Sequence, residues 1–199
     1  MFSVYNIYSQ NPKDTILFHK NIIDTNHRVV FIEPPHSDYH KKVIMSLLFD
    51  SATINEKVRI IDSLGLINNK RFNSKFLGNW ISTFLYKGIT YAYYPSEPYF
   101  NLYLRVTDST LVLNDFNDGL SLYAIKEIKN FNNEFSYKIV NSSKEEFTIS
   151  FIVKKGGVSL KSSLFKRNNI QIVNENNYSK LPIIVNFCPN ERCGEFQFQ

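Results

Sequence analysis

The residues best suited to chemistry form a short histidine–carboxylate segment near the start of the chain. His36 and His40 are four residues apart, and Glu33 and Asp38 lie beside them. Two histidines at this spacing on a helix can hold one metal ion, and imidazole near a carboxylate can act as a general acid–base pair. Ser37 rather than glutamate follows His36, so the HExxH pattern is absent. The segment is therefore a candidate metal or acid–base site, and the alternative is polar surface at the start of a helix.

The two cysteines of the chain, Cys188 and Cys193, form a C-x4-C pair. A zinc site built on such a pair needs a second pair of ligands, which the sequence does not supply nearby. We expect one buried and one exposed thiol, with a hairpin disulfide as the alternative in an oxidising compartment.

Other catalytic signatures are missing. The sequence has no G-x-S-x-G, no Walker lysine loop and no G-x-G-x-x-G, and its 7 glycines are too few to build a phosphate cradle. We expect a protein that is not an enzyme and has no cofactor, with a metal-dependent enzyme at the histidine segment as an alternative.

Two groups of residues are candidates for binding a partner. Tyrosines crowd around Pro95 and Pro98, and tyrosine is enriched at protein interfaces. A basic run without acids could attract an acidic partner, although it could also be an ordinary solvated hairpin. The predicted partner-binding residues are Tyr91, Tyr93, Tyr94, Tyr99, Lys154, Lys155, Lys161, Lys166 and Arg167.

The elements that position these residues change character along the chain. Residues 2–8, 15–18 and 29–32 are predicted strands, and residues 38–50 a helix that Ser37 or Asp38 caps. A second helix is predicted from a capping box of Thr53 and Glu56, with Gly65 at the left-handed C′ position and Leu66 after it. Residues 1–70 are thus predicted to be a mixed α/β unit.

The rest of the chain has a period of two, which is typical of strands. Asparagine- and glycine-rich turns separate the alternating runs, and we expect about eight to ten short strands in an antiparallel meander. The predicted fold class is α+β, with the α/β unit at 1–70 and a barrel or strongly curved sheet at 71–199. The clearest alternating sets begin at Phe100, Phe135, Phe147 and Leu181.

Gly78-Asn79-Trp80 stands at the start of this meander and contains the only tryptophan. A Gly-x-Trp on the first strand resembles the opening of lipocalin-like (calycin) barrels, and the resemblance covers residues 72–188. It implies that Trp80 closes one end of the barrel and that the interior holds a small apolar ligand. Because the predicted inward faces are rich in Phe, Leu and Ile, a filled interior is the alternative.

The net charge and the first residues of the chain indicate which partners and which cellular location to expect. The net charge of +5 is too small and too scattered for a nucleic-acid binder, and no apolar run is long enough to span a membrane. The first residues lack the features of a signal peptide, so we expect a cytoplasmic protein. By elimination, we expect a protein-binding module with an acidic partner, such as an inhibitor or toxin-immunity protein; a lipocalin-like carrier is the alternative.

Overall fold

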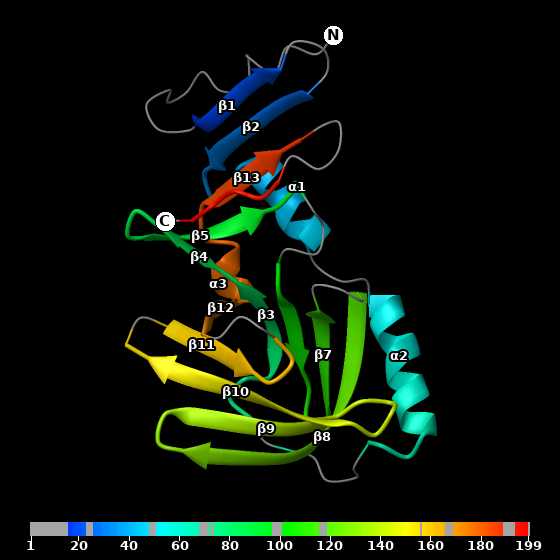
Figure 1. Ribbon diagram of the computed structural model, residues 1–199. Helices are drawn as coiled ribbons and strands as arrows, with labels where there is room; N and C mark the ends of the chain where they lie inside the picture. Colours follow the sequence, from blue (N-terminus) through cyan, green and yellow to red (C-terminus); the bar gives the residue numbers. More distant parts are fainter. Residues whose placement is uncertain are drawn as a thin grey trace.

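The computed structural model describes residues 16–22, 26–47, 51–67, 72, 74–96, 101–115, 119–155, 157–165, 169–188 and 194–198. Over these ranges the chain forms three helices and thirteen strands, which build a closed barrel and a separate five-stranded sheet (Figure 1). The predicted α+β class is confirmed. The predicted strand at 2–8 lies outside the described residues.

Eight of the described strands close the barrel, and each pairs antiparallel with the next barrel strand, β3 with β6 and so on, until β12 returns to β3. They are β3 (Gly78–Ser82), β6 (Tyr103–Val106), β7 (Thr110–Asp115), β8 (Gly119–Phe131), β9 (Glu134–Val140), β10 (Glu146–Lys154), β11 (Gly157–Ser162) and β12 (Ile170–Asn174). Closure leaves no free edge, which removes the risk of edge-to-edge aggregation.

Large side chains on the inward faces meet inside the barrel. The Phe151 ring stacks on Phe76 with centroids 4.5 Å apart, and the Tyr137 ring meets Phe151 edge-on at 5.2 Å. Ile139 and Ile149, from the same alternating runs, are fully buried beside them. The period of two in β9 and β10 therefore predicted the inward faces correctly, and aromatic and aliphatic side chains pack the interior.

The second sheet has the order β1-β2-β13-β5-β4. Its strands are β1 (Ile16–Ile22), β2 (Asn26–Glu33), β4 (Phe84–Tyr86), β5 (Ile89–Tyr94) and β13 (Ile183–Phe187). The β4–β5 hairpin departs from the barrel between β3 and β6, and β13 follows β12. The alternating run from Leu181 therefore belongs to this sheet and not to the barrel, where the sequence placed it. Strands from both sides of residue 70 share this sheet, and the domain boundary predicted there stays a prediction.

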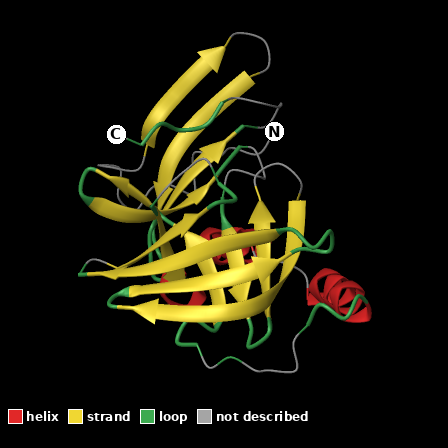
Figure 2. Cartoon of the chain, turned by 60° about the horizontal axis from the view of Figure 1, so that its bottom comes forward, coloured by secondary structure: helices red, strands yellow, loops and turns green. Residues whose placement is uncertain are grey.

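Three helices flank the sheets: α1 (Asp38–Leu47), α2 (Ser51–Ser63) and α3 (Glu175–Tyr178). Helix α2 stands outside the barrel wall (Figure 2), where Ile54 and Ile61 pack in one core with Leu122. The helix begins at Ser51, so the predicted start at Thr53 is wrong. Residues 51 and 52 are also helical, which places the start about half a turn earlier in the chain.

A shared core joins the barrel to the second sheet. Ile81 and Tyr103 face outward from the barrel and pack in one buried cluster with Ile183 and Val185 of β13. Helix α1 adds Val43 to the same cluster. Strands β3 and β6 are therefore buried on both faces, as strands between two cores must be.

Candidate functional sites

The histidine–carboxylate segment connects the end of β2 to the start of α1. The Ser37 hydroxyl donates to the carboxylate of Glu33, which is 7% exposed, and accepts the backbone N–H of His40 at 2.9 Å. This is an N-cap, because His40 is the third helical residue after Ser37. The backbone N–H of Lys41 donates to the Ser37 carbonyl at 3.0 Å, which closes the first turn. Of the two residues predicted to cap this helix, Ser37 and Asp38, it is Ser37 that forms the cap.

The four predicted side chains of this segment point to separate partners. His40 is 1% exposed, and its Nε2 lies 2.8 Å from the Leu181 carbonyl, so that nitrogen carries the proton and donates. Asp38 is exposed and pairs with Lys41 at 3.3 Å, and the rings of His36 and His40 have centroids 6.4 Å apart. Among the described residues, no group of three His, Cys, Asp or Glu side chains is arranged to hold a metal ion. In this arrangement the segment caps α1 and ties it to the turn after α3.

The predicted tyrosine cluster is mostly inside the protein. Tyr91 is 7% exposed and Tyr93 is fully buried, while Tyr94 is half-buried against the shared core. Tyr99 lies outside the described residues. Tyr91 and Tyr93 therefore have almost no area to offer a partner.

The C-terminal segment 194–198 covers these tyrosines. The Phe198 ring stacks on Phe84 at 4.5 Å and meets Tyr93 edge-on at 5.0 Å. The Tyr93 hydroxyl donates to the Glu195 carboxylate and accepts the Phe196 backbone N–H at 2.9 Å. Burial first, and the Glu195 carboxylate second, raise the pKa of Tyr93 above its ordinary value. Sequence analysis missed this segment, although Phe196 and Phe198 alternate with polar residues as a strand-like face would.

Cys188 follows β13 directly and is disulfide-bonded. The expectation of two separate thiols is therefore wrong. Cys193, the other cysteine of the chain, lies outside the described residues. Sequence spacing allowed both arrangements, because the distance between two thiols depends on the folded chain.

The basic run lies on the β10–β11 hairpin. Lys154, Lys155 and Lys161 are exposed, and no carboxylate of the described residues lies within 4.0 Å of their ammonium groups. Neighbouring lysines differ: Lys129 pairs with Glu127 at 3.2 Å, and Lys138 with Glu146 at 2.8 Å. The predicted partners Lys166 and Arg167 lie outside the described residues.

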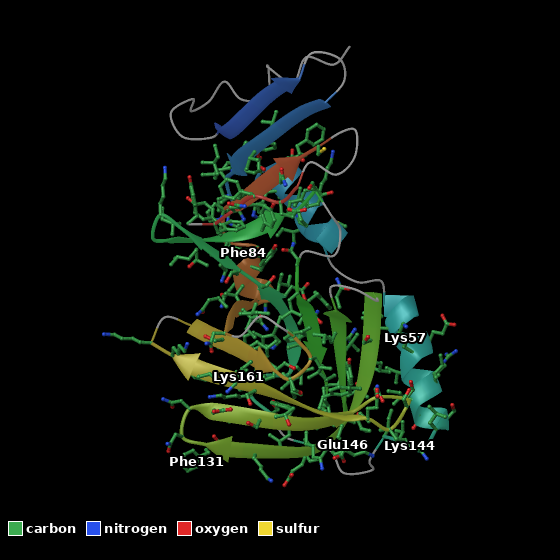
Figure 3. All side chains as sticks on the ribbon, in the orientation of Figure 1. Lys57, Phe84, Phe131, Lys144, Glu146 and Lys161 are labelled. Atoms are coloured by element: carbon green, nitrogen blue, oxygen red, sulfur yellow. The ribbon has the colours of Figure 1, made fainter. Side chains whose placement is uncertain are left out.

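An exposed phenylalanine lies close to this hairpin, and sequence analysis missed it. Phe131 ends β8, and its side chain is 76% exposed (Figure 3). The Val153 backbone N–H donates to the Asn133 carbonyl at 2.8 Å, so the β8–β9 turn lies against the end of β10. An apolar residue next to the Asn132–Asn133 turn was the available signal.

Trp80 lies on the first barrel strand, where the lipocalin resemblance placed it. Its Nε1–H donates to the Phe76 carbonyl at 2.8 Å, and its ring is 9% exposed. Phe76, from the segment that precedes β3, contacts both Trp80 and Phe151 inside the barrel. The described strands thus form a closed eight-stranded antiparallel barrel with an interior tryptophan.

The fold defines an α+β protein with a closed up-and-down barrel joined to a mixed sheet. No family model matches the chain, and no curated protein and no solved structure matches it either. Among the described helices, none is long and apolar enough to cross a membrane.

Proposed function

We propose that this chain is a non-enzymatic protein-binding module that docks an acidic partner on the β10–β11 side of the barrel. The observation that carries the proposal is the group of exposed lysines that have no described carboxylate partner, next to an exposed aromatic ring. We call this surface the basic hairpin surface; it consists of Phe131, Lys154, Lys155 and Lys161.

The charges of this surface support an acidic partner. Lysines that already form ion pairs, such as Lys129 and Lys138, are largely neutralised within the protein. The positive charges of Lys154, Lys155 and Lys161 are not offset by such pairs among the described residues. Their attraction for an oppositely charged surface accelerates association, and this attraction weakens as the salt concentration rises.

The exposed ring of Phe131 supports direct contact with the partner, in addition to the long-range attraction of the lysines. A phenylalanine that is 76% exposed lacks the burial that normally stabilises it. Aromatic side chains at the centre of an interface often carry most of the binding energy, and complementary charges on the same surface suppress wrong partners. Phe131 is therefore the proposed anchor, and an inhibitor or immunity protein that occludes its target would use such a surface.

The test is affinity capture by the full chain from its native source, followed by mass spectrometry. Changing Lys154, Lys155 and Lys161 together to Glu is expected to reduce recovery of a stoichiometric acidic protein by at least about tenfold. Phe131→Ser is expected to weaken the same complex and leave its salt dependence unchanged, because it removes no charge.

The matched control changes three exposed cations elsewhere, Lys42, Arg59 and Lys180, to Glu. It alters the net charge by the same amount and is expected to leave the partner bound. Equal loss of the partner in both triple variants would mean that only the total charge matters. Retention of the partner in both would show that the basic hairpin surface does not bind it.

A further inference from the structure

A cleft of about 330 Å³ lies on the other side of the barrel, between α2 and β8. The cleft arises because the two neighbours of β8 pair with it over different lengths. Strand β7 pairs with β8 from Gly119 onward, but β9 pairs with it only from Ala124 onward. The chain turns away after Val140, where β9 ends, and α2 lies along the outside. The opening between these elements is the α2–β8 cleft.

The lining of the cleft is mixed, and apolar side chains contribute to it from two elements. Ile60 and Ile61 come from α2, and Leu120 and Leu122 from β8. Ile61 and Leu122 are largely buried in the core that fixes α2 on the barrel, so Ile60 and Leu120 offer more of the apolar surface. The volume lies at the lower end of the range for small-molecule sites.

One cation stands among the lining residues. Lys57 precedes Ile61 by one helical turn, so its side chain lies on the same face of α2. It is half-buried, and no carboxylate of the described residues lies within 4.0 Å of its ammonium group.

The polar residues on the opposite side are provided by the β9–β10 turn. Asn141 donates its Nδ2–H to Glu145 at 2.7 Å and accepts the Glu145 backbone N–H at 2.9 Å. The carboxylate of Glu145 is therefore already hydrogen-bonded to Asn141 within the turn. Ser142 is exposed and also lines the cleft.

From this lining we propose that the α2–β8 cleft binds a small amphipathic anion, with an apolar body of one or two rings and one carboxylate or sulfonate. The apolar walls take the body, and the Lys57 ammonium group pairs with the anionic end. A half-buried lysine next to apolar walls is a stronger partner for an anion than a fully exposed one, because less water competes for it. This site is separate from the barrel interior and from the basic hairpin surface.

The test is a fluorescence titration of the full chain with anilinonaphthalene sulfonate, and with phenylnaphthylamine as its uncharged analogue. The sulfonate is expected to bind saturably at one site. Lys57→Gln is expected to weaken sulfonate binding by about tenfold and to change binding of the uncharged dye less than about twofold. Lys57→Arg, which keeps the charge, should retain the wild-type affinity for the sulfonate within about threefold.

Two further variants locate the site. Ser142→Trp, which fills the cleft without removing a buried side chain, is expected to weaken both dyes, whereas Lys42→Gln on the exposed face of α1 should change neither. An unchanged midpoint of urea unfolding shows that each variant is folded. Non-saturable binding, a sulfonate affinity unaffected by Lys57→Gln, or equal weakening of both dyes by that variant would each overturn the proposal.

Discussion

At the scale of single residues, buried tyrosine hydroxyls link stability to pH. Burial first, and the Glu175 carboxylate second, raise the pKa of Tyr103 to about 12. Burial likewise raises the pKa of Tyr93 and of Tyr137. The unfolded chain ionises its tyrosines near pH 10, so between pH 10 and 12 the folded state holds protons that the unfolded state has lost.

We therefore predict that the free energy of unfolding receives the full contribution of these groups below pH 10 and loses it as the pH rises to 12. Urea unfolding at several pH values measures this, and tyrosinate absorbance follows the ionisation itself. Tyr103→Phe should show a smaller decrease across this range than the wild type. A free energy of unfolding that stays level up to pH 12 would contradict the role given to burial.

At the scale of elements, the end of α2 depends on one glycine. Gly65 has φ +64°, its N–H donates to the Asp62 carbonyl at 2.9 Å, and the Leu66 N–H donates to the Ile61 carbonyl at 3.3 Å. This is a Schellman motif, and Leu66 is buried in the core below α2. The predicted C′ position of Gly65 and the contact of Leu66 are thus confirmed.

Gly65→Ala is expected to destabilise the protein by about 1 kcal/mol, because a side chain disfavours the left-handed region. A Cβ at this position would meet no atom within 4 Å, so the effect comes from the backbone alone. Gly65→Asn serves as the matched variant and should cost less, because asparagine tolerates this region. Chemical denaturation measures both, and equal losses in the two variants would indicate a cause other than backbone conformation.

At the scale of the whole molecule, the shared core makes the barrel and the five-stranded sheet depend on each other. Ile183 is fully buried on β13 and packs with Ile81 and Tyr103 of the barrel wall. Its truncation removes contacts from both parts at once.

We predict that the protein unfolds in one transition, with Trp80 fluorescence and far-ultraviolet circular dichroism giving the same midpoint in urea. Ile183→Ala should lower both midpoints together, with a loss of about 2–5 kcal/mol. Met45→Ala, at a side chain that is 74% exposed, should change stability by less than about 0.5 kcal/mol. A Trp80 signal that survives the loss of half the dichroism would show that the barrel is stable on its own.

Much of the local structure was determined by the sequence itself. Alternation in Phe135–Ile139 and Phe147–Val153 predicted which side chains face the barrel interior, and the Gly65–Leu66 pair predicted how α2 ends. Both signals act within a few residues, because the pleat of a strand and the cap of a helix are local geometry.

Only the tertiary structure decided which elements meet. An alternating strand specifies its apolar face but not its neighbour, so the run from Leu181 could have joined the barrel instead of β2 and β5. Tyr93 is buried because a segment more than 100 residues later covers it, as its contact with Phe196 shows. Phe131 is exposed because nothing described packs over the end of its hairpin. Burial depends on contacts between distant parts of the chain, whereas sequence patterns report only the neighbours along it.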